Sequence, residues 1–219
     1  MILCAPDADC AAEYARSVRS AGRRDMSLNI VLTGVGGQGT VLASKLISAA
    51  AMRKGLEVKS AETIGMAQRG GSVFSHIRIG EDALSPMIAE GEADLIIAFE
   101  PAEAVRMLPF LKEGGAVITA DRPVMPVTAA LKGSDYNGRE MIDYLASLDN
   151  IGMLVVVDTD SAIREIGNPK AMNMLLLGAA SRAGLLGDIS HTDIVNAMKD
   201  RVKPQFVDIN LKALEYVKV

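Results

Sequence analysis

A glycine-rich stretch near the start of the chain has the composition of a phosphate-binding turn. Gly34, Gly36 and Gly39 follow the spacing G-x-G-x-x-G, between a short apolar run, Leu28 to Thr33, and a segment with helical spacing, Thr40 to Arg53. Glycines allow a tight turn, and the first turn of a helix offers unpaired N–H groups and a positive dipole end to an anion. The stretch therefore predicts a phosphate or diphosphate site formed by Gly34, Gly36, Gly37, Gln38, Gly39 and Thr40.

The spacing of this glycine turn leaves other interpretations open. NAD would bind there if Glu57 or Glu62, roughly 20 residues downstream, held the ribose of the dinucleotide. A P-loop that hydrolyses ATP is disfavoured, because Thr40 stands where such a loop has its lysine. The glycines could also serve only to let the helix pack closely against the strand, without any ligand.

A second glycine-containing segment lies where the second strand of the predicted sheet ends. Carboxyl ends of parallel strands share one edge of a sheet, so we expect this segment and the glycine turn to border one crevice. Arg69 would form charge-assisted bonds with a phosphate or carboxylate, and Gly70, Gly71 and Ser72 would turn the chain and expose N–H groups. Alternatively, Arg69 is a solvated loop cation and the glycines only shape an insertion.

Apolar runs and glycines along the chain predict strands that alternate with helices. The expected strands, after the one that precedes the glycine turn, are Glu57 to Ala61, Asp94 to Phe99, Ala116 to Ala120 and Met153 to Asp158. The expected helices, after the one that follows the glycine turn, are about Pro101 to Leu111, Lys170 to Ala183, His191 to Arg201 and Gln205 to Val217.

One segment breaks this alternation of strand and helix. Ser72 to Gly80 alternates apolar and polar residues, which is typical of a half-exposed antiparallel strand, and we place it in an insertion that ends near Met87. The predicted fold class is therefore α/β: a doubly wound, mostly parallel Rossmann-like sheet, an insertion with an antiparallel strand, and a helical C-terminal third.

Composition narrows the environment and the partners of the chain. The 219 residues are 49% hydrophobic, which suffices for one α/β domain. The formal net charge is −4 and the pI about 5.3, so no basic field attracts nucleic acid. No apolar stretch approaches the roughly 20 residues of a membrane-spanning helix, and the N-terminus lacks the basic start of a secretory signal. We expect a cytoplasmic protein that binds no membrane.

The two cysteines, Cys4 and Cys10, lie in an N-terminal segment without clear periodicity. They cannot supply the four thiolates that an iron–sulfur cluster usually needs. His76 in an alternating strand is expected to be a packing residue, and Ser190 and Asp193 around His191 indicate a helix cap. We therefore predict no metal site, a disordered extension over residues 1–26, and a single domain over residues 27–219.

The two glycine segments, together with His76, Arg78 and the later Phe99-Glu100-Pro101, resemble the gamma-type domain of the 2-oxoacid:ferredoxin oxidoreductases. Within that family, the small (beta) subunits of the indolepyruvate-type enzymes are the most similar. The resemblance spans about Ser27 to Val219 and includes Asn168-Pro169 and the segment through Asn173 and Gly178. The pair of glycine motifs is far more specific than either motif alone.

This resemblance implies a complex in which the chain holds no cofactor by itself. A large (alpha) subunit would carry thiamine diphosphate, Mg and iron–sulfur clusters, decarboxylate an aryl 2-oxoacid oxidatively to an acyl-CoA, and reduce ferredoxin. The glycine turn and the Arg69 segment would then bind a phosphate-bearing ligand, coenzyme A first of all, or form the interface with the large subunit. The resemblance identifies no catalytic residue in this chain, and the chain would be inactive alone.

Two further functions remain as alternatives to the oxidoreductase subunit. A stand-alone NAD-dependent dehydrogenase would need a hydride-relay group, and neither Tyr136 nor Tyr144 has a lysine four residues on. A non-catalytic nucleotide-binding module would differ only in lacking an enzymatic partner. Twelve methionines and a positive mean hydropathy of +0.23 indicate an apolar docking face, so the isolated chain is also expected to form a homodimer.

Overall fold

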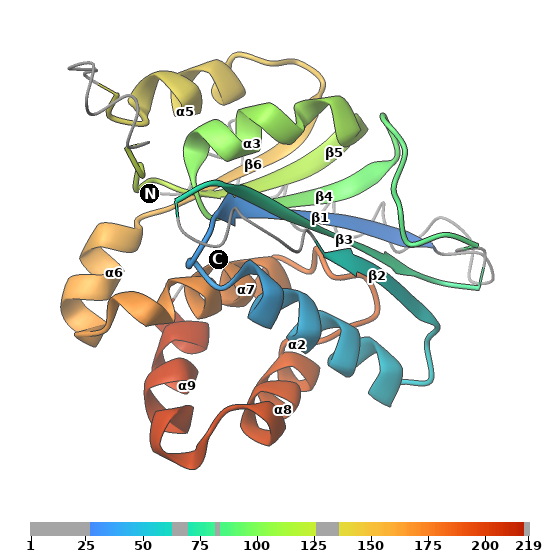
Figure 1. Ribbon diagram of the computed structural model, residues 1–219, viewed down its shortest axis with the longest axis vertical. Helices are drawn as coiled ribbons and strands as arrows, with labels where there is room; N and C mark the ends of the chain where they lie inside the picture. Colours follow the sequence, from blue (N-terminus) through green and yellow to red (C-terminus); the bar gives the residue numbers. More distant parts are fainter. Residues whose placement is uncertain (1–26, 63–69, 82–83, 126–135, 217–219) are drawn as a thin grey trace.

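A single mixed sheet forms the centre of the molecule, with helices on both faces (Figure 1). The computed structural model describes residues 27–62, 70–81, 84–125 and 136–216. The sheet has six strands in the order β2-β3-β1-β4-β5-β6. Their bounds are β1 Leu28–Val35, β2 Val58–Glu62, β3 Ser72–Ile79, β4 Ala93–Ala98, β5 Leu111–Ala120 and β6 Ile151–Val157.

Strand direction divides the sheet into two parts. Strands β1, β4, β5 and β6 are parallel, whereas β3 is antiparallel to both of its neighbours, β1 and β2. After β1 the chain goes to one side for β2 and β3 and then crosses to the other side for β4, so the carboxyl ends of β1 and β4 flank a topological switch point. Open α/β sheets bind ligands at such points.

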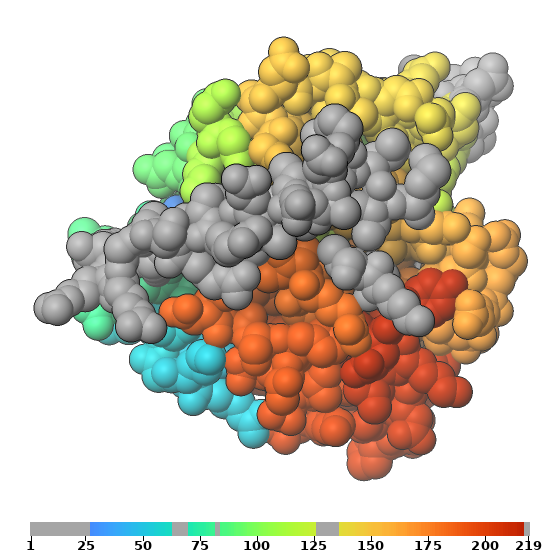
Figure 2. Space-filling view, turned by 180° about the vertical axis from the view of Figure 1, so that it is seen from behind, coloured from blue at the N-terminus to red at the C-terminus, as the bar shows by residue number. Residues whose placement is uncertain are grey.

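Helices cover the two faces of the sheet unequally. On one face lie α3 (Pro101–Met107) and α5 (Arg139–Ala146), and on the other lie α2, α7, α8 and α9 (Figure 1). Seen from behind, the orange and red C-terminal segments form one layer, with the cyan segment at the end of α2 beside it (Figure 2). The remaining bounds are α2 Thr40–Arg53, α6 Thr159–Ile166, α7 Met172–Arg182, α8 His191–Arg201 and α9 Val207–Tyr216, with short 3-10 helices η2 (Leu108–Phe110), η3 (Pro169–Ala171) and η4 (Pro204–Phe206).

Alternate residues of the sheet serve two cores. Ile30 and Leu32 of β1 face the larger core with α2 and α7, whereas Val31 between them faces the smaller core under α3 and α5. Every residue of β1 is buried, which explains why its sequence is almost continuously apolar. Helix α7 is also buried from Met172 to Ser181, so it connects the sheet to the outer C-terminal helices.

A close backbone contact joins α7 to α9. A Cβ atom added to Gly178 would lie 2.4 Å from the carbonyl oxygen of Leu214, which is well inside van der Waals contact. The glycine therefore lets the two helix backbones approach more closely than any other residue would allow.

The predicted fold class is confirmed, with one correction. Ser72 to Gly80 forms the predicted antiparallel strand, β3, but the prediction that this strand is half-exposed is wrong, because β3 lies inside the sheet between β1 and β2 and most of its residues are buried. Its polar residues mislead, since both Ser75 and His76 are buried. The strand expected at Glu57 to Ala61 is β2, but it forms the sheet edge and does not touch β1.

The C-terminal helices lie close to their predicted positions, but the sequence pattern did not predict two short helices. Helix α8 has the predicted bounds, and its N-terminus has the expected capping box between Ser190 and Asp193. Helices α5 and α6 were not predicted, and each has only eight residues. The predicted extension over residues 1–26 lies outside the described residues. None of the described helices is long and apolar enough to cross a lipid bilayer.

Candidate functional site

The glycine turn connects the buried strand β1 to helix α2. Gly37 and Gly39 have φ values of +104° and +89°, which other residue types rarely adopt. Gly39 is the N-cap of α2, and no side chain caps this helix end. The first turn of α2 also contains no acidic residue. Its N–H groups therefore point outward without a side-chain acceptor, as in anion sites at helix N-termini.

The second glycine segment lies directly beside this turn. The amide of Gly36 donates a hydrogen bond of 2.8 Å to the carbonyl oxygen of Gly71, and Gly70 returns a longer one of 3.5 Å to Gly36. The structure thus brings the two segments together at one edge of the sheet. Arg69 lies outside the described residues, and its role in binding stays a prediction.

A pocket of about 470 Å³ opens along the glycine turn. The lining comes from three parts of the chain: the glycine turn, the residues that follow β5, and the stretch from α6 to the start of α7. Two cations belong to the lining, Arg122 and Lys170. The full lining is Gly37, Gln38, Gly39, Arg122, Val124, Ile163, Pro169, Lys170, Met172 and Asn173.

The charge of this pocket is positive. Arg122 has a partly exposed partner, Asp160, at 3.7 Å, and Lys170 has no ion pair among the described residues. No lining residue is acidic. Backbone N–H groups and two cations around one pocket form a binding site for negative charge.

Side chains of the turn itself fill part of the space around it. Gln38 accepts a hydrogen bond from the amide of Val35 at 2.6 Å and donates one to the carbonyl oxygen of Phe99 at 2.9 Å. A Cβ atom on Gly34 would lie 2.7 Å from Gln38 Oε1, and one on Gly39 would lie 2.7 Å from Asn173 Nδ2. Gln38 therefore holds the turn together, and a contact of its amide with a ligand stays a prediction.

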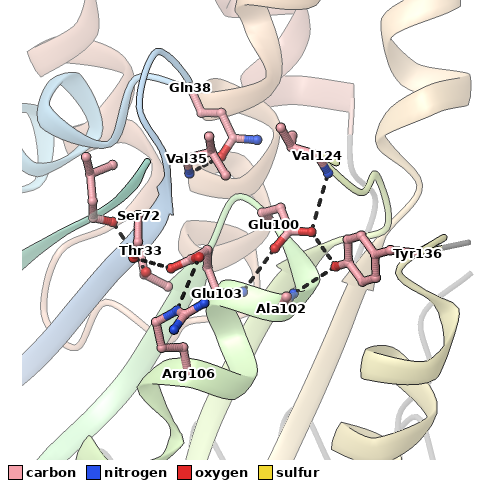
Figure 3. A network of polar contacts seen from close by, with 11 residues as sticks. Thr33, Val35, Gln38, Ser72, Glu100, Ala102, Glu103, Arg106, Val124 and Tyr136 are labelled. Atoms are coloured by element: carbon pink, nitrogen blue, oxygen red, sulfur yellow. Dashed lines mark hydrogen bonds and ion pairs between the residues drawn. The ribbon is translucent and has the colours of Figure 1, made fainter. Parts of the chain in front are cut away.

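Two buried glutamates lie on the other side of the turn, at the start of α3 (Figure 3). Glu100 caps α3 by accepting the amide of Glu103 at 3.0 Å, and it also accepts the hydroxyl of Tyr136. Glu103 accepts the hydroxyl of Ser72 at 2.5 Å. We call Glu100, Glu103, Tyr136 and Ser72 the carboxylate network.

The Tyr136 hydroxyl is the donor in its bond with Glu100. Burial and the adjacent carboxylate raise the pKa of Tyr136, so the phenol keeps its proton. The only cation paired with the network in the described part of the chain is Arg106, whose Nε lies 3.3 Å from Glu103 and whose side chain is largely exposed.

Both histidines contact neighbouring residues of the fold, and His76 packs as predicted. His76 Nδ1 accepts the amide of Ile88 at 2.9 Å, the ring packs between Phe74 and Phe110, and burial lowers its pKa. His191 Nδ1 lies 2.8 Å from Ser181 Oγ, and burial is the main cause that lowers its pKa. Among the described residues, no group of three or more His, Cys, Asp and Glu side chains could hold a metal ion.

The arrangement disfavours the NAD alternative. In a dinucleotide-binding fold the acidic residue that holds the ribose ends the strand next to β1. Here β3 occupies that position, while Glu57 and Glu62 flank or end the edge strand β2. The sequence alone did not predict that Arg122 and Lys170 belong to the site, although both have recognisable positions. Arg122 comes two residues after the carboxyl end of β5, and Lys170 directly follows Asn168-Pro169.

Fold and site define a class of protein: an α/β subunit whose glycine turn lies at the switch point of a mixed sheet and faces a basic pocket. The family described as pyruvate ferredoxin/flavodoxin oxidoreductase matches residues 29–217, so the chain belongs to this family. The resemblance found in the sequence is thereby confirmed.

Several relatives cover nearly the whole chain. Indolepyruvate oxidoreductase subunit IorB of Archaeoglobus fulgidus is 41% identical over 192 residues, which are 87% of this chain and 93% of the relative. Its counterpart in Thermococcus kodakarensis is 38% identical over 187 residues, 85% and 92% of the two chains. The common gamma subunit of the pyruvate/ketoisovalerate oxidoreductases of the same organism is 25% identical, over 86% and 94%.

Solved structures show the same fold. The gamma subunit of a keto/oxoacid ferredoxin oxidoreductase from Geobacter sulfurreducens has a TM-score of 0.63 at 22% identity, over 86% of this chain and 94% of that one. A 2-oxoglutarate:ferredoxin oxidoreductase from Magnetococcus marinus, solved with 2-oxoglutarate, coenzyme A and succinyl-CoA bound, has a TM-score of 0.63 at 21% identity, over 89% of this chain and 30% of that one. The chain is thus a subunit of a 2-oxoacid:ferredoxin oxidoreductase.

Proposed function

We propose that this chain is the cluster-free subunit of an indolepyruvate-type 2-oxoacid:ferredoxin oxidoreductase, and that its glycine-turn pocket binds the phosphate groups of coenzyme A. The observation that carries the proposal is the pocket itself: the uncapped N-terminus of α2, Arg122 and Lys170 border one pocket of about 470 Å³. That volume falls in the range of roughly 300–1,000 Å³ found for small-ligand sites.

Coenzyme A fits the chemistry of this pocket. Its diphosphate would accept hydrogen bonds from the backbone N–H groups at the start of α2, and the two cations would neutralise part of its charge. Gln38 holds the turn by two hydrogen bonds within the chain, so little ordering of the turn is needed on binding. The distant Magnetococcus neighbour that shares the fold was solved with coenzyme A bound, which supports this choice of ligand.

The remaining chemistry belongs, in this proposal, to other polypeptides. A large subunit would hold thiamine diphosphate, Mg and the iron–sulfur clusters, decarboxylate an aryl 2-oxoacid oxidatively, and pass the electrons to ferredoxin. The acyl group would be transferred to the thiol of coenzyme A, which this chain holds by its phosphate end. The relatives named as indolepyruvate oxidoreductase subunits support the aryl substrate. A cytoplasmic location and a homodimer of the isolated chain stay predictions.

Calorimetric titration with coenzyme A tests the ligand role, on the full chain alone and on the complex assembled with its partner subunits. Lys170→Ala should weaken binding about tenfold, because a charge-assisted contact to a phosphate is lost. Lys199→Ala is the matched control, since Lys199 is an exposed lysine of α8 outside the pocket. Arg69→Ala tests the predicted role of Arg69 in the same titration.

Equal affinity of the unaltered chain and the Lys170→Ala variant would remove the pocket from the proposal. No binding by either the chain or the complex would remove coenzyme A as its ligand. Affinity purification from native cells tests the partner: recovery of a large thiamine- and cluster-binding subunit is expected, and its repeated absence would contradict the proposed complex.

A further inference from the structure

The segment Phe99 to Glu103 contacts two of the chain segments that line the glycine-turn pocket, and also the second glycine segment beside the turn. The carbonyl oxygen of Phe99 accepts Gln38 Nε2 at 2.9 Å, which fixes the glycine turn. Glu103 accepts the hydroxyl of Ser72 at 2.5 Å, which fixes the second glycine segment. Glu100 accepts the amide of Val124, one of the pocket-lining residues, at 3.4 Å.

We propose that Glu100 and Glu103 are positioning residues for the glycine-turn pocket: Glu100 holds the pocket-lining Val124, and Glu103 holds Ser72 of the second glycine segment, which is hydrogen-bonded to the glycine turn (Figure 3). Neither glutamate lines the pocket, so neither touches the ligand. This inference rests on the proposed function only for the identity of the ligand.

Burial is what gives this pair its positioning role. Glu100 is 2% exposed and Glu103 is 6% exposed, so water cannot replace a lost partner easily. Each oxygen of Glu100 has a protein donor: Oε2 accepts the amide of Glu103, and Oε1 accepts the Tyr136 hydroxyl and the Val124 amide. A buried carboxylate with protein donors on both oxygens has one preferred orientation, and it imposes that orientation on its donors.

Tyr136 extends the same arrangement. Its hydroxyl accepts the amide of Ala102 at 3.2 Å and donates to Glu100, so it joins the first turn of α3 to the chain just before α5. Ser72 performs the equivalent task on the other side: as the first residue of β3 it pairs with Val35, the last residue of β1, next to the glycine turn.

The test uses hydroxyl deletions, which leave the fold of a buried carboxylate site largely intact. Tyr136→Phe and Ser72→Ala each remove one hydroxyl donor to a glutamate. Ser72→Thr keeps a hydroxyl at position 72. Tyr144→Phe in α5 is the matched control, because Tyr144 is exposed. Hydrogen exchange of single amides is followed by NMR on the full chain, and coenzyme A binding by calorimetry on the chain and on the assembled complex.

The expected result is local. Tyr136→Phe should speed exchange of the Val124 amide about tenfold, because Glu100, its acceptor, loses the Tyr136 hydroxyl. Ser72→Ala should speed exchange of the Gly36 amide, which donates to Gly71, because the neighbouring Ser72 no longer bonds Glu103. Amides of the central strands, such as Ile96 and Val117, should keep their rates. Coenzyme A should bind about tenfold more weakly to both variants, with normal affinity in Ser72→Thr and Tyr144→Phe.

Uniform acceleration at Ile96 and Val117 as well would overturn the proposal, since it would mean general destabilisation. Unchanged exchange and unchanged affinity would overturn it too. If the unaltered complex does not bind coenzyme A, the proposed ligand fails separately, and the exchange rates at Gly36 and Val124 still decide whether the carboxylates position the pocket.

Discussion

The glycine-turn pocket and the carboxylate network lie on either side of one strand end, yet they are built in opposite ways. The pocket uses backbone N–H groups and two exposed cations, Arg122 and Lys170. The network uses buried side chains that each have a defined partner. Changes to the network should therefore affect stability first, and changes to the pocket should affect binding first.

The largest expected effect comes from Glu100→Ala. Helix α3 loses its N-cap and the Tyr136 hydroxyl loses its acceptor, so the free energy of unfolding should fall by about 2–4 kcal/mol. Urea denaturation measures it. Glu140→Ala, an exposed glutamate in the first turn of α5, should stay within about 0.5 kcal/mol of the unaltered chain. A similar small change in Glu100→Ala would abolish the contrast between the two regions.

A smaller loss of stability is expected from Gly39→Ala in the pocket. Its positive φ costs an alanine roughly 1–2 kcal/mol, and the new Cβ would press on Asn173. Gly55→Ala is the control, because Gly55 also has a positive φ but an added Cβ would meet no atom within 4 Å. Thermal unfolding should show the larger decrease for Gly39→Ala. Equal decreases would mean that Asn173 moves aside at no cost.

The smallest expected effect is a gain in affinity. Asp160→Asn frees Arg122 from its exposed ion pair, so coenzyme A should bind about twofold more tightly in calorimetry at low salt. Asp143→Asn is the matched control, since Asp143 pairs with Arg139 within α5. Weaker binding in Asp160→Asn would show that Asp160 orients Arg122 toward the ligand.

The sequence allowed the glycine turn to be placed because every contribution to it is local. A strand, glycines at fixed spacing and a helix follow one another within about 25 residues, and the periodicity of the helix matches α2 at both ends. The second glycine segment was also placed correctly beside it, as the hydrogen bond between Gly36 and Gly71 shows.

The rest of the site depends on long-range packing that no short motif encodes. Arg122 precedes β6 and α6 in the chain and Lys170 follows them, yet both line the pocket. Tyr136 likewise bonds Glu100, 36 residues earlier in the chain. The position of β3 was missed for a related reason. Its alternating pattern indicates a solvent-exposed face, but His76 is buried, packs against Phe74 and Phe110, and accepts the amide of Ile88.

The segment from Pro169 to Asn173 belongs both to the pocket and to the C-terminal helical layer. It supplies four residues of the pocket wall, Pro169, Lys170, Met172 and Asn173, and it also begins α7, whose Gly178 carries the backbone contact with α9. A ligand in the pocket would contact both the glycine turn, which begins α2, and the start of α7, which packs against α9. Binding and the melting of the C-terminal layer are then thermodynamically linked, and the linkage grows with the logarithm of ligand concentration.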